Sequence, residues 1–508
     1  FFIMQRVLQS RNRNVLYRSI RCMSQAVEDP YGKVLEKKGK QTDQNVKPFN
    51  SIPGPANAKD FLSFLQKAKQ VADRPHKEVF YELIFKEYGD IVRCDQGTNP
   101  NIYLGNADYI QKAAEFGKEP LSGSQFYKDY QKKNDIPSCL MGSDRAHYAE
   151  AVNKCVNRPE FIQKQEGPIK AISLEAVKFL QKNLDSYTKV TPGLMSMILL
   201  FSLESVFWMC FSKSSGAFVQ KESLAGRFVG IQREISSSEA SLHRNPLAKW
   251  IPTPSWYTYT KGLDKLYDLT LQLIKDADEE QKDSIYKFLS SYKNSDGKGF
   301  SERELTVLLA DILMPATGYT APTILWLLHD IAKNKDIQNK IIEEYNSSNG
   351  NLKKSPYLLA VIKESMRLHP IQDSVLLHTG QKEMKIGDYE IPKLVGLTCV
   401  HSNTSLSPEY FVQPLEFKPE RWLDEKNKSH PYATAPFGLG ARKCPAQSIG
   451  YLQIATLVQE LLKAFELDSD PEEYVEAQYQ PLLAPTAPFD IAFHLRNPTK
   501  QKPIQQKK

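Results

Sequence analysis

The sequence is poor in cysteine and in long uninterrupted apolar stretches, and each shortage excludes a class of protein. Its seven cysteines are odd in number and scattered over 508 residues. This usage excludes a disulfide framework and indicates a reducing compartment. The most apolar stretch, residues 193–211, contains Glu204, and its flanks define no membrane topology. We therefore expect a buried helix there and not a transmembrane span.

Acidic residues are absent from residues 1–27. This segment contains five arginines, together with serines and apolar residues spaced for an amphipathic helix. We interpret it as a mitochondrial transit peptide, with a basic tail of no targeting role as the alternative. Removing these five charges from the net charge of +7 leaves about +2, and such a balanced chain gives no reason to expect a nucleic-acid partner.

The rest of the composition, 41% hydrophobic and 25% charged, is that of an ordinary globular protein. Residues 28–50 are polar and lysine-rich, which predicts a linker. A single domain is expected over residues 51–497, beginning at the rigid turn SIPGP, and residues 498–508 are expected to be a disordered tail.

Apolar periodicity predicts mostly helices with a small β region. Helices are expected at 76–88, 107–116, 193–211, 306–334, 336–345, 356–369 and 446–465. Strands are expected at 90–94 and 102–104, and hairpins at 374–399 and 481–495. Pro315 and Pro322 fall inside the helix expected at 306–334, where each would interrupt the hydrogen-bond ladder and bend the helix.

The densest signal lies in residues 435–450, APFGLGARKCPAQSIG. Two glycines precede Arg442, Lys443 and Cys444, and a helical pattern follows. Pro445 suits the first helical position, where a missing N–H costs nothing. A cysteine at a helix N-terminus beside two cations is in an environment that favours the thiolate.

Such a thiolate could attack a substrate or bind a metal. The sequence has no second cysteine or histidine at zinc spacing around Cys444. A single cysteine ligand suits haem iron, because the porphyrin supplies the other four equatorial donors. Taken alone, Cys444 is better explained as a buried free thiol beside a helix cap, because buried cysteines are common.

The arrangement Phe437-x-x-Gly440-x-Arg442-x-Cys444-x-Ala446 resembles the haem-binding loop of the cytochromes P-450. The match includes all the fixed positions, with alanine accepted where glycine is commoner. The resemblance implies a mainly helical, haem-enclosing domain, haem b as cofactor, and Cys444 as the iron ligand. It also places Phe437, Gly440 and Arg442 in the cofactor-binding loop.

Two further motifs occur in the order that this family has. Glu364 and Arg367 resemble the Glu-x-x-Arg pair of its helix K, and PERW at 419–422 resembles the segment whose arginine, here Arg421, completes an ion-pair network with that pair. Their implied role is structural, in the core beneath the haem.

The propionate-binding positions of the family are only partly matched. Residues 142–157 fall at its helix C, where Arg145 lies near the usual tryptophan position and His147 is a second candidate. A solvated helix face explains these residues as well. His378 falls where the family has an arginine on the other propionate, and histidine can also donate a hydrogen bond.

The helix expected at 306–334 resembles helix I, which crosses the distal face of the haem. Most members have an acid and a threonine there that deliver protons to iron-bound dioxygen, whereas this chain has Gly318 and Tyr319. Thr320 and Thr317 are the nearest hydroxyls and become the candidate catalytic residues. Tyr319 also fits a simple packing role.

The transit peptide points to the mitochondrial branch of the family, which takes electrons from NADPH through a ferredoxin reductase and a ferredoxin. A lysine before the helix K glutamate helps to bind ferredoxin there, and Lys363 occupies this position, although Leu359 replaces the second lysine. A solvated charge is the alternative for Lys363. The short link before helix K and the loop around Cys444 look similar to arthropod ecdysteroid-hydroxylating members.

We therefore expect a mitochondrial haem-thiolate monooxygenase acting on a lipophilic, sterol- or steroid-like substrate, with peripheral association at the matrix side of the inner membrane. Two other functions stay open. Loss of the acid and threonine also suits a haem-thiolate isomerase or dehydratase, which needs no electron donor. A non-catalytic haem-binding protein would bind haem and show no turnover.

Overall fold

The computed structural model describes most of the chain. It covers residues 46–55, 64, 77–94, 100–117, 125–137, 139–140, 145–183, 191–218, 223–244, 252–277, 283–380, 382–424, 429–440, 443–473, 475–479, 482–485 and 489–496. The predicted transit peptide, most of the predicted linker, and the predicted tail at 498–508 lie outside these residues. Lys47 forms a β-bridge with Tyr389, so the folded region includes residues before the predicted start at 51.

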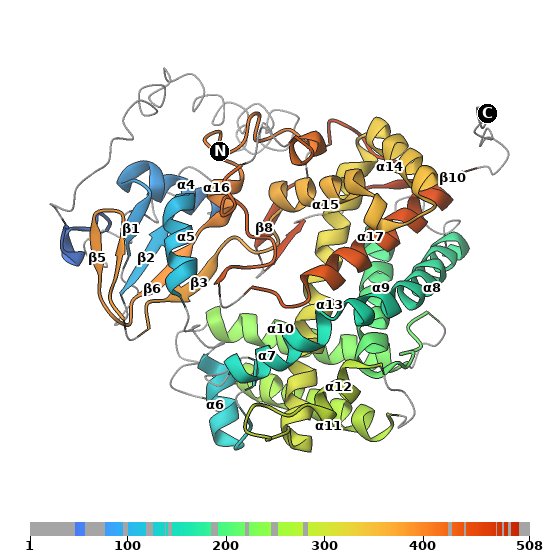
Figure 1. Ribbon diagram of the computed structural model, residues 1–508, viewed down its shortest axis with the longest axis horizontal. Helices are drawn as coiled ribbons and strands as arrows, with labels where there is room; N and C mark the ends of the chain where they lie inside the picture. The colour runs from blue at the N-terminus through green and yellow to red at the C-terminus, as the bar shows by residue number, and fades with distance from the viewer. Residues whose placement is uncertain are drawn as a thin grey trace, which may run out of the picture.

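Helices dominate the described part of the chain, as predicted (Figure 1). They are α4 (Lys77–Tyr88), α5 (Ala107–Phe116), α6 (Gln125–Lys133), α7 (Arg145–Val156), α8 (Pro159–Asn183), α9 (Thr191–Phe211), α10 (Leu224–Arg244), α11 (Pro254–Lys275), α12 (Ile285–Ser291), α13 (Glu302–Ala332), α14 (Lys335–Ser348), α15 (Pro356–Leu368), α16 (His401–Ser405) and α17 (Gln447–Ala464). The described residues also form 3₁₀ turns at η1 (Phe49–Ser51), η4 (Leu352–Lys354) and η5 (Pro419–Trp422).

In the part of the chain that the structure describes, the strands form one four-stranded sheet and three pairs. The sheet has the order β1 (Ile91–Arg93), β2 (Asn101–Leu104), β6 (Gly396–Cys399), β3 (Val375–His378), in which β2 and β6 are parallel and the outer pairs antiparallel. The pairs are β4 (Met384–Ile386) with β5 (Tyr389–Ile391), β7 (Phe465–Asp468) with β10 (Ala492–Leu495), and β8 (Ala477–Tyr479) with β9 (Leu483–Pro485). The predicted turn at 386–388 is present, with Gly387 at φ +55°.

Two sequence predictions fail here. The chain after α17 forms no hairpin over 481–495, because β9 pairs with β8 and β10 returns to β7 beside α17. A short strand with a weak hydrophobic pattern pairs with whichever strand edge the tertiary fold brings beside it. Pro445 is also not the first residue of its helix, since α17 begins at Gln447 with Ala446 as N-cap.

The most apolar helix, α9, lies inside the protein, although its residues 193–211 are long and apolar enough to cross a membrane. Its buried Glu204 accepts hydrogen bonds from the backbone N–H groups of Ser215 and Ala217 and from the Ser215 hydroxyl. The carboxylate thus holds the loop that follows α9, which explains an acid in an apolar core helix.

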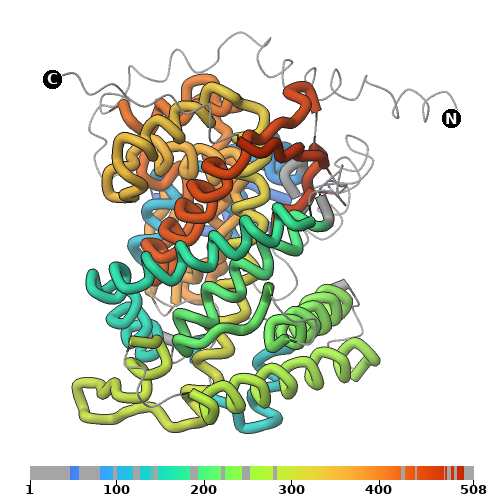
Figure 2. The backbone as a smooth tube through the Cα atoms, turned by 90° about the vertical axis from the view of Figure 1, so that its right-hand side faces the viewer, coloured from blue at the N-terminus to red at the C-terminus, as the bar shows by residue number. Residues whose placement is uncertain are grey.

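The long helix α13 connects the two main helical cores. Its N-terminal half packs with α6, α7, α10, α11 and α12, and its C-terminal half packs with α8, α9, α14, α15 and α17. Figure 2 shows α8 and α17 running alongside each other, with α10 and α11 forming a separate pair at one end of the molecule. A capping box of Ser301 and Glu304 fixes the N-terminus of α13. The helix continues through Pro315 and Pro322, so neither proline ends it.

Candidate active site

Cys444 lies at the end of a tight loop that precedes α17. The loop turns at Gly438 and Gly440, whose φ angles of +76° and +53° strongly favour glycine. The Cys444 N–H donates to the Phe437 carbonyl oxygen at 2.7 Å and closes the loop. A Cβ on Gly440 would stand 2.5 Å from the Ala114 carbonyl oxygen, so the loop packs directly against α5.

The protein by itself does not give Cys444 the low pKa expected from sequence. Desolvation raises the pKa of the thiol, and the backbone N–H of Ala446 offsets this only in part. Cys444 precedes α17 by three residues, and the side chain of Lys443 is exposed to solvent, so helix dipole and cation act more weakly than predicted. Arg442 lies outside the described residues. A bound metal ion would deprotonate the thiol instead.

The Cys444 loop lies between the sheet and α13. Residues 435 and 439 of the loop share a buried cluster with α5 and β3, whereas Ala446 and Ile449 on the other side pack in the cluster that contains Leu313 of α13. Cys444 itself is half-buried. The loop therefore presents the cysteine between these two elements.

The middle of α13 is accessible, although the helix is buried on both sides of it. Residues 305–310 and most of residues 321–332 are buried, but Pro315 and Tyr319 are exposed and five other residues from 312 to 320 are half-buried. Tyr319 keeps 39% of its surface accessible in the longest described helix. A core helix uncovered only at its centre is suited to lining a ligand site.

Strand β3 presents a second accessible wall. Val375 and Leu377 are buried in the sheet core, while Leu376 is 47% exposed and His378 is half-buried. The His378 Nδ1 accepts the Gly380 N–H at 3.0 Å. The neutral ring therefore has its hydrogen on Nε2, which is free of described protein partners and suited to donate to a carboxylate.

These residues fit a haem. The set offers a half-buried thiol on a glycine turn, accessible apolar walls on β3 and α13, and an imidazole donor for a propionate. Among the described residues, no group of three His, Cys, Asp or Glu side chains could hold a metal ion, so a macrocycle would have to supply the remaining ligands. The side chain of Arg145 lies outside the described part, whereas His147 packs against Phe300 and Tyr148.

The two candidate threonines differ in their surroundings. Thr317 is 2% exposed, donates to the carbonyl oxygens of Leu313 or Met314 at 3.0 and 3.1 Å, and accepts from Gln232 Nε2 at 3.1 Å. Thr320 is half-buried and donates to the Ala316 carbonyl oxygen at 2.9 Å, which leaves its lone pairs available. Thr320 is the more accessible hydroxyl.

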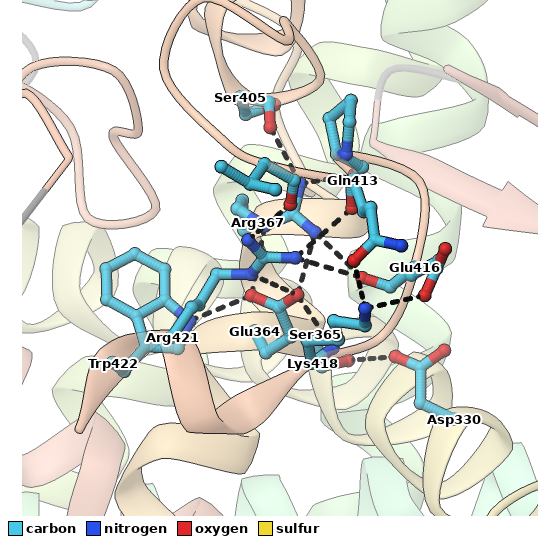
Figure 3. A network of polar contacts seen from close by, with 12 residues as sticks. Asp330, Glu364, Ser365, Arg367, Ser405, Gln413, Glu416, Lys418, Arg421 and Trp422 are labelled. Atoms are coloured by element: carbon cyan, nitrogen blue, oxygen red, sulfur yellow. Dashed lines mark hydrogen bonds and ion pairs between the residues drawn. The ribbon is translucent and has the colours of Figure 1, made fainter. Parts of the chain in front are cut away.

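The structure brings Glu364, Arg367 and Arg421 together (Figure 3). The Glu364 carboxylate, which is fully buried, accepts from Arg367 Nε and Nη2 at 3.0 and 2.8 Å and from Arg421 Nε at 2.9 Å. Sequence reasoning missed two further donors, Trp422 Nε1 at 2.8 Å and the Lys418 N–H at 3.0 Å. Trp422 follows Arg421 directly, so its place in the PERW segment was the available signal.

The guanidinium groups in turn hold the backbone of the segment after α16. Arg367 donates from Nη1 to the carbonyl oxygens of Ser405 and Pro414 at 2.8 and 2.6 Å, and Arg421 donates to that of Val412 at 2.8 Å. The network therefore ties α15 to residues 405–422.

A second buried cluster joins α13 to α15 and was not expected from sequence. Asp330 accepts from the Ser365 hydroxyl at 2.6 Å and lies 3.0 Å from His369 Nε2. The His369 ring stacks on Trp326 at 4.5 Å between ring centroids. These side chains fix the C-terminal half of α13 against the helix that bears Glu364.

Lys363 lies on the outer face of α15. Its side chain is exposed, and its Nζ lies 5.9 Å from the centre of the Trp422 ring. The lysine is therefore accessible to a partner, and its neighbour Glu364 points into the buried network.

Comparisons with known proteins show which family the chain resembles. The family model described as "Cytochrome P450" matches residues 53–493. A rat relative named "1,25-dihydroxyvitamin D(3) 24-hydroxylase, mitochondrial" is 25% identical over 90% of this chain and 91% of its own length. A Drosophila melanogaster relative, "Probable cytochrome P450 12c1, mitochondrial", is 25% identical over 89% and 92%, and the mouse "Sterol 26-hydroxylase, mitochondrial" is 22% identical over 76% and 78%.

The glycine loop that presents a lone cysteine, together with the buried glutamate–arginine network around Glu364, defines a haem-thiolate enzyme. The chain belongs to the cytochrome P450 family. The predicted fold class, haem b cofactor and monooxygenase class are thereby confirmed.

Proposed function

We propose that this chain is a mitochondrial monooxygenase that hydroxylates a sterol- or steroid-like lipophilic substrate with dioxygen and electrons from a ferredoxin. The observation that carries this proposal is the half-buried Cys444 on its glycine loop, between the buried cluster that contains α5 and β3 and the cluster that contains Leu313 of α13. The names of the mitochondrial relatives and the arginine-rich, acid-free segment at 1–27 support the compartment and the electron donor. Peripheral association at the matrix side of the inner membrane is part of the proposal.

Each site residue has a role in this scheme. Bound haem supplies dioxygen activation, and a cysteinate ligand favours O–O cleavage. Cys444 anchors the cofactor, with Phe437, Gly440 and Arg442 shaping its loop. His378 would donate from Nε2 to one haem propionate, and Arg145 is the candidate for holding the other.

Thr320 is the proposed hydroxyl for proton delivery. Its hydrogen is committed to the Ala316 carbonyl oxygen, so its lone pairs can hold a water molecule whose own hydrogen is passed on. Thr317 is buried and fully hydrogen-bonded, which favours a structural role. We expect Thr320→Val to reduce the product formed per NADPH oxidised severalfold, with Thr317→Val as the comparison.

Lys363 is the proposed contact for an acidic ferredoxin, because it is exposed on the helix that bears Glu364. Lys363→Glu should raise the KM for ferredoxin severalfold at low salt and leave substrate binding unchanged. Lys178→Glu on α8, an exposed lysine that forms no ion pair with the described residues, is the matched control. Equal effects of the two variants would remove Lys363 from the docking site.

The first test is the carbon monoxide difference spectrum of the reduced enzyme beside Cys444→Ala. A red-shifted Soret band that disappears in the variant is the expected result. Turnover with ferredoxin, its reductase and a panel of sterols then follows by mass spectrometry. Absence of that band in folded, haem-loaded protein would contradict the proposal.

An isomerase or dehydratase is the second candidate, because Gly318 and Tyr319 occupy the positions of the usual acid and threonine. The two functions differ in their need for electrons. Turnover of an oxygenated substrate without NADPH would favour this candidate, and strict dependence on NADPH would exclude it.

A further inference from the structure

Tyr319 occupies the accessible centre of α13 and presents a phenol there. Tyr319 keeps 39% of its surface accessible, and the helix is buried on both sides of it. Desolvation and the negative charge of Glu239 on α10 raise the pKa of Tyr319. The phenol therefore remains protonated at neutral pH and keeps a hydrogen to donate.

The hydrogen bond with Gln372 leaves the phenol hydrogen of Tyr319 available for another acceptor. Gln372, an exposed residue between α15 and β3, donates from Nε2 to the Tyr319 Oη at 3.0 Å. The phenol oxygen is thus the acceptor in this pair, and its own hydrogen is not used by any described protein acceptor. An amide on the segment before β3 and a phenol on α13 meet across the two accessible walls of the site.

The other polar side chains near the centre of α13 are already committed. Thr317 and Thr320 donate to helix carbonyl oxygens, and Gln232 donates to Thr317 and to the Met314 carbonyl oxygen. Among the described residues of this stretch, Tyr319 therefore has a hydroxyl hydrogen that remains available to donate to a ligand. Its surroundings include the half-buried Ile312, Met314 and Ala316, which suit an apolar skeleton.

We propose that Tyr319, positioned by Gln372, orients the substrate by donating a hydrogen bond to an acceptor oxygen, a carbonyl or hydroxyl, on an otherwise apolar skeleton. This inference takes its substrate class, sterol- or steroid-like molecules, from the proposed function. It adds the hydrogen bond by which the enzyme would distinguish one member of that class from another. An apolar site binds analogues with and without an oxygen similarly, whereas a single donor discriminates between them.

The test measures binding to the full-length holoenzyme. The probes are 5α-androstane and its 3-keto and 17-keto derivatives, and the readout is the shift of the ferric Soret band during titration. At least one ketone should bind about 3- to 10-fold more tightly than the hydrocarbon, as one neutral hydrogen bond predicts. Tyr319→Phe should abolish this preference and leave haem content and hydrocarbon binding unchanged.

Gln372→Glu provides a sharper variant. The new carboxylate would accept the Tyr319 hydrogen, so the phenol would stay in place and lose its free donor. The ketone preference should disappear as it does in Tyr319→Phe. Tyr389→Phe, on the β4–β5 hairpin, is the matched control and should keep the preference.

Three results would overturn the proposal: no ketone binds more tightly than the hydrocarbon; the preference survives Tyr319→Phe or Gln372→Glu; or binding is unchanged and only the product formed per NADPH falls. The last result would assign the phenol to oxygen chemistry. Loss of ferredoxin-supported product formation with the preference intact would instead contradict the proposed function, so the two failures are distinguishable.

Discussion

Replacing Glu364 by glutamine tests the buried network at its centre. The carboxylate is fully buried and accepts five hydrogen bonds, two from Arg367 and one each from Arg421, Trp422 and the Lys418 N–H. Glutamine preserves the shape but removes the charge and replaces one oxygen with an NH₂ group. Each carboxylate oxygen of Glu364 accepts from at least two donors, so in either orientation the amide NH₂ would face groups that can only donate.

The expected loss of stability is large. Two guanidinium groups would remain in the interior without their counter-charge, and at least two donors would lose an acceptor. Breaking a buried ion pair by removing one partner costs about 3–5 kcal/mol, which is a substantial part of the ~5–15 kcal/mol that stabilises a typical domain. The free energy of unfolding, measured by urea titration followed by circular dichroism, should fall by this amount.

Glu420→Gln is the matched control. Glu420 lies in the same segment and pairs with Lys340 at 2.7 Å, but both side chains are about half exposed, at 54% and 51%. An exposed pair is worth up to about 1 kcal/mol, so this variant should change little. If Glu364→Gln lost no more stability than Glu420→Gln, the central role of Glu364 in the fold would be refuted.

Two further predictions concern the cysteine loop and acid stability. Gly440→Ala would place a Cβ 2.5 Å from the Ala114 carbonyl oxygen, so it should lower both the Tm and the amount of bound haem. Gly297→Ala is the control, because Gly297 also has a positive φ, +75°, but open space around it, so this variant measures the backbone strain without the clash. Desolvation lowers the pKa values of His329 and His401 to about 4, so both are neutral in the folded protein at neutral pH. The unfolded chain takes up these protons first, so stability should fall by up to about 3 kcal/mol per histidine as the pH drops from 6.5 to 4. Urea titrations at pH 7 and 4.5 measure this loss, which His329→Leu should reduce; an equal loss in the variant would show that His329 is not a source of it.

Local sequence patterns predicted most of the helices near Cys444 well. Helix α5 begins and ends where expected, because Asn106 caps it and accepts the N–H groups of Asp108 and Tyr109. The predicted helix over 306–334 is present, and the capping box at Ser301 begins it four residues earlier. These outcomes depend on contacts within a few residues, which periodicity and capping signals encode.

Features that depend on distant contacts were not predictable from the sequence. β10 pairs with β7 across 23 or more intervening residues, and the sequence of neither short strand indicates its partner. The raised pKa of Cys444 also follows from burial, which outweighs the nearby amide. A motif identifies which charges are near in sequence, but it does not give the solvent exposure of the sulfur.

The sequence by itself determined the family, the candidate iron ligand Cys444 and the residue types of the network around Glu364, because short motifs with fixed spacing encode them. The tertiary structure alone decided which hydroxyls are already committed, and it placed Gln372 against Tyr319 across 53 residues. The physical reason is that hydrogen-bond direction and exposure are properties of packed surfaces, which form only when distant segments meet.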